Sequence, residues 1–483
     1  MGTELYKHPQ FEAMETEYRL FQDLSEGRHA VMIQPQYLWM HELEYATKDG
    51  PKYRAIREKR SRYTNLFEPV ESTWVSMALR DEVDIDEETQ KLFGEHINNV
   101  DGEGHDLKSF LMLKVAPAYF RYGNVHIITD TPDVGDVTNA SKETARAKGL
   151  RPYFEAVTPL ECPDWVLAPG MPSCSAVYQA FRNEYQADAP RSALTDKPQR
   201  KSYSTVRALV GGNYIITRYE SNDLDGNKSW EVKSQKVVGR YNEIPVAGVI
   251  CDPWLKDVAQ LCLRLFNLES ALDSQLNAQA FQRIIVSGNM SNDAKMAWNE
   301  YVVNFAPESS AVTVVEPSNP AALQARIEQT VEQLQRVAFN RNHSLPGDSK
   351  ESPSADASNA MKEEQISLAL QAVTDLETLI NRAVKHWAML SGNNNFKGKV
   401  TLGRDIAEED IEASINRFMT LADEIKKVPT WYKASLKRIV DREQLAEEDK
   451  IKDEIDALPE QGADTSAQAS REQILAAAAG VNG

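Results

Sequence analysis

The chain has 483 residues, of which 42% are hydrophobic and 26% are charged, so it has the composition of a soluble globular protein with room for two to four domains. Its formal net charge is −18. Proteins that hold DNA by displacing its counterions are basic, and this balance therefore excludes a chain that wraps DNA.

The sequence also disfavours membrane and secreted proteins. No run of about 18 apolar residues occurs, and the N-terminus lacks the basic, apolar and small-residue regions of a signal peptide. We therefore expect neither membrane insertion nor secretion. The cysteines form no CxxC pair, and we expect them to be reduced and buried; they are Cys162, Cys174, Cys251 and Cys262.

The first quarter of the chain is helical in pattern. Apolar residues at spacings of three and four predict a helix that ends near Gly27; they are Phe11, Met14, Tyr18, Phe21 and Leu24. A second helix is expected to start at Pro69, and the acidic stretch 81–88 to be a loop and a helix start. A third helix is expected over 107–122, where Pro117 should kink or end it, and a strand over 125–129.

From 151 to about 249 the pattern becomes β. Three strands are predicted at 203–210, 213–219 and 230–238, with turns at Gly211-Gly212 and Asp225-Gly226. This spacing is typical of an antiparallel meander, so the first half of the chain reads as an α+β domain. The polar stretches 140–148 and 187–201 are predicted to be loops.

The segment from Pro253 to Leu390 alternates helices with breakers. A helix over 253–279 is apolar on almost all sides, which predicts burial on more than one face. Strand candidates at 283–286 and 311–315 frame an insert of about 40 residues. A second helix follows Pro320, and its polar face consists of Gln324, Glu328, Glu332, Gln335 and Arg336.

A polar loop and a long helix complete this segment. Residues 343–358 are rich in Ser, Pro and Asp, which predicts an exposed loop. Ser358 or Asn359 should then cap a helix of about 30 residues. Beyond it we expect a short strand over 399–402, helices at about 407–426 and 430–456, and an Ala/Gln/Ser-rich tail.

Motifs for catalysis are few. The chain has neither a GxxxxGK[ST] phosphate loop nor a GxSxG elbow, and its eight histidines are scattered. Gly102-Glu103-Gly104 is a fragment of a glycine motif without a preceding strand, and a plain loop is expected there. Asp84 and Asp86, and likewise Asp133 and Asp136, fall in turn-like contexts. We therefore predict no enzyme activity, no catalytic residue, no metal and no cofactor.

Three short motifs succeed one another in a familiar order. The first motif is Tyr119-Phe120-Arg121-Tyr122-Gly123, which is followed by a strand and Thr131-Pro132. The second is Pro152-Tyr153, followed by Pro163-Asp164-Trp165. The third is Ile244-Pro245, followed by Asp252-Pro253-Trp254-Leu255. With the helix, insert, helix, loop and long helix that follow, this order resembles the portal proteins (head-to-tail connectors) of tailed bacteriophages, in their compact form. The resemblance covers residues 1 to about 457.

The resemblance implies a mainly helical α+β portal fold with wing, stem, clip and crown, assembled as a ring of twelve subunits. It assigns residues 1–251 to the wing, 252–280 and 320–341 to the stem, 281–319 to the clip, 342–358 to the tunnel loop, 359–404 to the long wing helix and a short strand, 405–457 to the crown and 458–483 to a C-terminal tail. A heterologous ring interface would explain why the first stem helix is apolar all round.

The family's role implies a set of partners and candidate residues. The ring would sit in the virion at one capsid vertex after assembly in the host bacterial cytoplasm, with no membrane involved. It would contact the major capsid protein and scaffold, the terminase large subunit and a head-tail adaptor or tail protein, and pass double-stranded DNA without reading its sequence. The channel-lining candidates are Gln324, Glu328, Gln335, Arg336, His343, Asp348, Lys350 and Glu351. The clip docking candidates are Arg283, Trp298, Asn299 and Glu300.

The charges of two segments indicate how such a ring would interact with DNA. The loop 342–358 contains Lys350 as its one fixed cation against Asp348, Glu351 and Asp356, and residues 405–457 carry 15 acidic and 9 basic side chains. Such surfaces would guide DNA and would not clamp it. Two alternatives stay open: a helical scaffold or assembly protein of a phage particle without a channel, and a hydrolase or nuclease with an acidic metal site.

Overall fold

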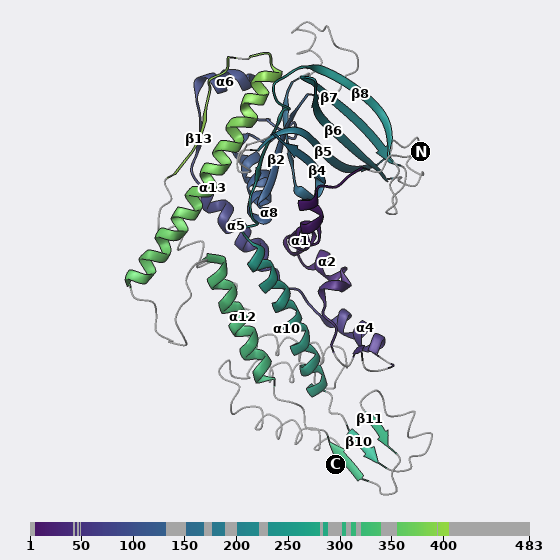
Figure 1. The fold of residues 1–483 in the computed structure, drawn as a ribbon. Helices are drawn as coiled ribbons and strands as arrows, with labels where there is room; N and C mark the ends of the chain where they lie inside the picture. Colours follow the sequence, from purple (N-terminus) through teal and green to yellow (C-terminus); the bar gives the residue numbers. More distant parts are fainter. Residues whose placement is uncertain are drawn as a thin grey trace. The chain divides into compact units, whose positions relative to one another are not determined.

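The computed structural model describes residues 5–41, 44–45, 48, 50–131, 151–168, 176–188, 200–221, 230–280, 284–287, 302–305, 311–314, 320–339, 355–393 and 395–404. The chain divides into two units, one of residues 1–31, 65–262 and 336–415, the other of 32–64, 263–335 and 416–483. The mixture of helices and antiparallel strands confirms the α+β class (Figure 1). Among the described helices, none is long and apolar enough to cross a membrane.

The first helices of the first unit follow the predicted periodicity. Helix α1 (Pro9–Glu26) ends at Gly27 and buries Phe11, Tyr18, Phe21 and Leu24. Helix α5 (Phe67–Ala78) begins two residues before the predicted Pro69. The reason is that the Asn65 side-chain oxygen accepts hydrogen bonds from the Phe67 and Glu68 N–H groups, which caps the helix ahead of the proline.

The acidic stretch 81–88 contains a strand that its composition does not predict. Strand β1 (Val83–Ile85) pairs with β13 (Val400–Leu402), more than 300 residues away in the chain. Helix α6 (Glu87–Phe93) follows, and the Asp86 carboxylate caps it by accepting a 2.8 Å hydrogen bond from Thr89 N. A short 3₁₀ turn, η2 (Gly94–His96), comes next.

The helix predicted over 107–122 is present and continues through Pro117, but it changes its type twice. Helix α7 (Leu107–Phe110) passes through a π-helical turn, η3 (Leu111–Val115), into α8 (Ala116–Tyr122). Pro117 lies in the first turn of α8, where its missing N–H is least costly, and the wider turn before it accommodates its ring. Gly123 ends α8 in the left-handed conformation, with φ 64°.

An antiparallel sheet of eight strands follows (Figure 1). Its order is β3-β2-β9-β5-β6-β7-β8, and β4 pairs with β5 beside this path. The strands are β2 (Asn124–Asp130), β3 (Tyr153–Val157), β4 (Asp164–Leu167), β5 (Ala176–Asp188), β6 (Arg200–Val210), β7 (Asn213–Ser221), β8 (Glu231–Arg240) and β9 (Val246–Ile250). A 3₁₀ turn, η4 (Pro159–Glu161), lies between β3 and β4.

The predicted meander is confirmed as β6, β7 and β8, with Gly211 and Gly212 both at positive φ in the first turn. The predicted loop 187–201 is wrong at both ends, because the β5–β6 ladder extends to the pairs Ala187–Lys201 and Asp188–Arg200. A paired strand that is exposed on one face tolerates polar residues, so composition alone does not mark its end.

Helix α13 (Ala355–Leu390) packs against β2, β9, β13 and α5. It begins at Ala355, ahead of the predicted caps, since alanine favours a helix. Trp387 of α13 contacts Phe93 and Phe154 with ring centroids 5.0 and 4.9 Å apart. The core of the first unit therefore lies between α13 and the sheet.

The cysteines follow the prediction in part. Cys162 and Cys262 are buried thiols outside any disulfide, and Cys251 is a half-buried thiol that is likewise not in a disulfide. Cys174 lies outside the described residues, as do Asp225-Gly226, residues 140–148, residues 342–354 and everything from 405 onward. The predicted crown helices and C-terminal tail therefore stay predictions.

His126 of β2 is buried and should make stability depend on pH. Tyr178 Oη lies 2.7 Å from His126 Nδ1, and Nε2 has no hydrogen-bond partner among the described residues. Burial lowers the pKa of His126 to about 3, so the folded chain rejects a proton that the unfolded chain takes up near pH 6.5. The stability contributed by neutral His126 is thus complete above that pH and is lost as the pH falls towards 3.

We expect this histidine to remove about 2 kcal/mol of stability between pH 6.5 and pH 5. His126→Gln should flatten this part of the pH–stability curve, measured by urea unfolding at each pH, even though it lowers stability overall. His29→Gln, at an exposed histidine, is the matched control and should leave the slope unchanged. An unaltered slope in His126→Gln would contradict the assignment.

The second unit contains most of the two helices that flank the predicted insert, and the strands between them in the chain. Helices α10 (Lys256–Ala280) and α12 (Ala321–Phe339) each contribute residues to both units. Between them lie three strands, β10 (Ile284–Ser287), β11 (Val302–Phe305) and β12 (Ala311–Val314), in the order β11-β10-β12. Strands β10 and β12 confirm two predicted strands, and β11 is an addition that the polar stretch around it hides.

Residues 32–64 belong to the second unit, whereas the resemblance assigns all of residues 1–251 to the wing. They comprise the end of α2 (Arg28–Met32), the 3₁₀ turn η1 (Pro35–Tyr37) and α4 (Gly50–Arg60). Polar hydrogen bonds tie this segment to α10. Asn267 Nδ2 donates to Tyr37 O over 2.9 Å, and Asn267 Oδ1 accepts from Trp39 N over 2.7 Å.

Candidate functional site

Helix α12 carries the described part of the candidate channel surface. Glu328 and Arg336 are exposed and Gln324 is half-buried. These residues, with exposed Glu332, recur every four positions and so form one row along the helix. Helix α12 thus presents a polar row of residues 324, 328, 332 and 336, which we term the α12 row.

Gln335 does not belong to this row. It is buried, because it lies four residues after Val331 and three before Ala338, on the apolar side of α12. The prediction that it shares the exposed polar face is therefore wrong within the single chain. The other candidates lie outside the described residues: His343, Asp348, Lys350 and Glu351 of the loop, and Arg283, Trp298, Asn299 and Glu300 of the insert.

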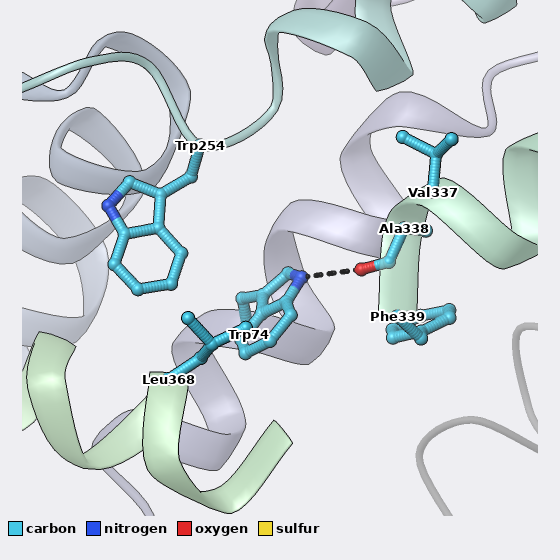
Figure 2. A pocket seen from close by; sticks show the side chains of 6 residues that line it. All are labelled: Trp74, Trp254, Val337, Ala338, Phe339 and Leu368. Carbon is cyan, nitrogen blue, oxygen red and sulfur yellow. Dashed lines mark hydrogen bonds between the residues drawn. The ribbon is translucent and has the colours of Figure 1, made fainter. Parts of the chain in front are cut away.

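The C-terminal end of α12 is held by two side chains from distant parts of the first unit. Trp74 Nε1 donates a 3.1 Å hydrogen bond to Ala338 O, as Figure 2 shows, and Gln365 Nε2 donates a 2.6 Å bond to Phe339 O. The last four carbonyls of a helix have no partner within it, and these donors satisfy two of them. One donor comes from α5 and the other from α13, so both helices fix the point where α12 ends.

Aromatic side chains surround this anchor point. Phe339 stacks on Trp74 with ring centroids 6.5 Å apart, and Trp74 meets Trp254 at 5.9 Å. Trp254 in turn contacts Phe120 and Tyr119 at 5.5 and 5.8 Å. Two of the motifs singled out in the sequence, 119–123 and 252–255, are therefore in contact with each other.

The space between these rings is small. The hollow lined by Trp74, Trp254, Phe339 and Leu368 has a volume of about 10 Å³, which is room for about one water molecule (Figure 2). Tyr119 Oη also donates a 2.7 Å hydrogen bond to Asp375, which ties α8 to α13. We conclude that this cluster is an anchor for α12 and is too small to bind a cofactor or substrate.

The glycine fragment at 102–104 forms an ion-pair loop. Asp101, Glu103 and His105 offer ligand atoms within 4.8 Å of one another, a spacing that could hold a metal ion. Lys114 Nζ, however, lies 3.0 Å from the Asp101 carboxylate and 2.8 Å from that of Glu103. Burial raises the pKa of Asp101, but hydrogen bonds from His105 and Lys114 outweigh it and hold that pKa well below its usual range. The lysine is thus the cation that this loop already holds.

The remaining carboxylate candidates are dispersed. Asp84 is exposed on β1 opposite Thr401, and Asp86 serves as the cap of α6. Asp133 and Asp136 lie outside the described residues. Within the described ranges, Asp84 is therefore not part of a cluster of metal ligands.

The anchor residues Trp74 and Gln365 have no sequence signal of their own. The contacts that they make span 264 and 26 residues. Taken singly, Trp74 reads as part of an apolar stripe, and Gln365 is a polar residue just before the stripe that begins at Ile366. The chain matches no protein-family model, and no curated protein is significantly similar to it.

Proposed function

We propose that the protein is a portal protein, which forms a ring of about twelve copies at one vertex of a tailed-bacteriophage capsid and passes double-stranded DNA during packaging and ejection. The observation that carries the proposal is the order of elements from α10 to α13. Two helices bracket a three-stranded insert, and a 36-residue helix follows. An insert bracketed in this way suits a docking surface at the end of a stem.

The α12 row supports the DNA-conducting part of the proposal. Glu328 and Glu332 against Arg336 leave a net negative charge on each copy. Repeated around a ring, this charge would repel the DNA backbone and let it slide. The anchor at Trp74, Gln365 and Phe339 would keep the end of α12, and with it the start of the loop 342–358, at a fixed place.

The remaining partners follow from the same role. The insert 281–319 would dock the terminase large subunit during packaging and a head-tail adaptor or tail protein afterwards. The ring would contact the major capsid protein and scaffold during assembly. In this proposal the protein itself has no catalytic residue, and the terminase large subunit supplies the energy for packaging.

Electron microscopy of the purified protein tests the proposal directly. We expect a ring with an axial opening and, by native mass measurement, about twelve copies. A stable monomer at high concentration would contradict it. A closed ring with no axial opening would instead favour the non-channel scaffold.

A charge substitution tests whether the α12 row faces DNA. Glu328→Lys should make the assembled ring bind double-stranded DNA, with an affinity that falls steeply between 50 and 200 mM salt, because each released counterion adds to the salt dependence. A gel-shift titration at the two salt concentrations measures this. Gln329→Lys combined with Gln333→Lys changes the charge by the same amount on a neighbouring face of α12, and it is the matched control. Equal DNA binding by both variants would show that the row does not line the channel.

A further inference from the structure

Exposed apolar side chains are concentrated in one short stretch of the second unit. Of the twelve large hydrophobic residues exposed in the described chain, five lie between positions 33 and 53. They are Ile33, Trp39, Met40, Tyr45 and Tyr53, which we call the aromatic segment. Tyr45 is 71% exposed and Trp39 is 51% exposed. Apolar groups gathered in this way on a soluble protein mark an interaction surface.

The backbone beneath these side chains is fixed by buried polar groups. Trp39 N donates to Asn267 Oδ1, and Trp39 O accepts from the Arg57 guanidinium. Arg54 donates to the carbonyls of Pro35 and Leu38 over 2.6 and 3.1 Å. The chain therefore holds the main chain around Trp39 in place while the indole faces solvent. A side chain whose backbone is ordered before binding loses less conformational entropy when a partner binds.

A buried ion pair between Arg57 and Glu44 stabilises the backbone beneath the aromatic segment. Arg57 Nε and one terminal nitrogen lie 2.7 and 2.8 Å from the two oxygens of Glu44, and the other terminal nitrogen is 3.2 Å from Ser270 Oγ of α10. Both side chains are only 5% exposed. A bidentate pair of this kind fixes the orientation of both groups, so it sets the position of the aromatic segment on α10.

The chemistry of the segment favours a protein partner over nucleic acid. Arg57 is neutralised by Glu44, and Arg54 pairs with Glu58 at 2.8 Å. Trp, Tyr and Met are the residues enriched at the centres of protein interfaces. The exposed charges beside them on α4 are basic, Lys52, Lys59 and Arg60, in a chain whose net charge is −18. Another copy of this acidic chain is therefore complementary to the segment.

We infer that the aromatic segment is the surface through which one copy of this chain binds the next. The contact would be heterologous, since the segment of one copy would meet a different, acidic face of its neighbour, and such contacts repeat into rings. This inference rests on the proposed function, because it names residues that would join the ring.

Photo-crosslinking identifies what covers the segment. A benzophenone amino acid replaces Tyr45 in the full chain, and isotopically labelled and unlabelled copies are mixed, assembled and irradiated. We expect cross-linked peptides that join a labelled copy to an unlabelled one. The same amino acid at Tyr6, which is 67% exposed, is the control and should give few such pairs. Cross-links confined to single chains, or equal yields from both positions, would overturn the inference.

Truncation of the segment measures its contribution. Trp39→Ala combined with Tyr45→Ala should raise the protein concentration needed for half-assembly about 30-fold or more, as expected for the loss of interface anchors. Tyr6→Ala should leave assembly unchanged, and circular dichroism checks that each variant is folded. If the double variant assembles like the parent into channelled rings, this inference fails and the portal proposal stands. If the parent forms no ring but position 45 still cross-links pairs, the portal proposal fails and the inference stands.

Discussion

Glu44→Ala should destabilise the second unit by about 3–5 kcal/mol, one of the two largest effects that we expect from a single substitution in this chain. The substitution leaves the Arg57 guanidinium buried beside Ser270 without the carboxylate that neutralises it. A buried charge without its partner costs far more than the pair contributes when it is intact. Because the chain has two units, amide hydrogen exchange over α4 is the suitable measurement.

Two controls separate the ion pair from other effects of the substitution. Glu87→Ala removes the exposed pair between Lys91 and Glu87 and should change stability by less than about 1 kcal/mol. The double variant Glu44→Leu with Arg57→Met removes both charges and should recover much of the loss, because apolar replacements of a buried pair are often neutral. If Glu44→Ala exchanges no faster than the parent, the pair does not hold the segment.

Local periodicity accounts for the parts of the fold that the sequence predicts. The apolar stripe from Phe11 to Leu24, the long stripe of α13 and the Gly211-Gly212 turn each depend on neighbours within a few residues. Their patterns of three to four residues for helices, and of two for strands, are therefore visible without tertiary information.

Contacts between distant residues account for most of what the sequence does not predict. The acidic strand β1 exists because β13 supplies its hydrogen bonds from more than 300 residues away. Strand β9 lies between β2 and β5, although the chain reaches it only after β8. Gln335 is polar yet buried, because its position in the turn of α12 outweighs its composition. These outcomes follow from pairing and packing, which a single-sequence pattern does not encode.

The sequence likewise predicts some residues of the candidate site and not others. The sequence singles out Tyr119, Phe120 and Trp254 as members of short motifs, and the structure brings their rings together. It does not single out Trp74 or Gln365, whose donors bind two carbonyls at the end of α12. In the sequence, a side chain that caps another helix cannot be told apart from any other residue of an apolar stripe or of the surface. Such a donor is therefore recognised only in the folded structure.

The backbone conformation at the last residue of the motif 119–123 requires glycine. Gly123→Ala should therefore be severely destabilising. Gly123 has φ 64°, and a methyl group there would collide with Cys251 O and lie 2.6 Å from the carbonyl carbon of Asp252. Both obstacles are main-chain atoms, and Cys251 N already donates a 2.7 Å hydrogen bond to Gly123 O. We expect a cost of about 2–5 kcal/mol, the sum of the left-handed conformation and the overpacking.

Gly211→Ala is the matched control, because Gly211 has φ 59° but no described atom within 4 Å of the added methyl group. It should cost only the conformational part, about 1–2 kcal/mol. Denaturant unfolding of both variants, with hydrogen exchange over β2 and β9, measures the difference, and equal costs would show that the approach to residues 251–252 is not tight. The predicted damage should extend to the anchor of α12, because the displaced segment Cys251-Asp252, which follows β9, continues directly into Trp254, which packs on Trp74.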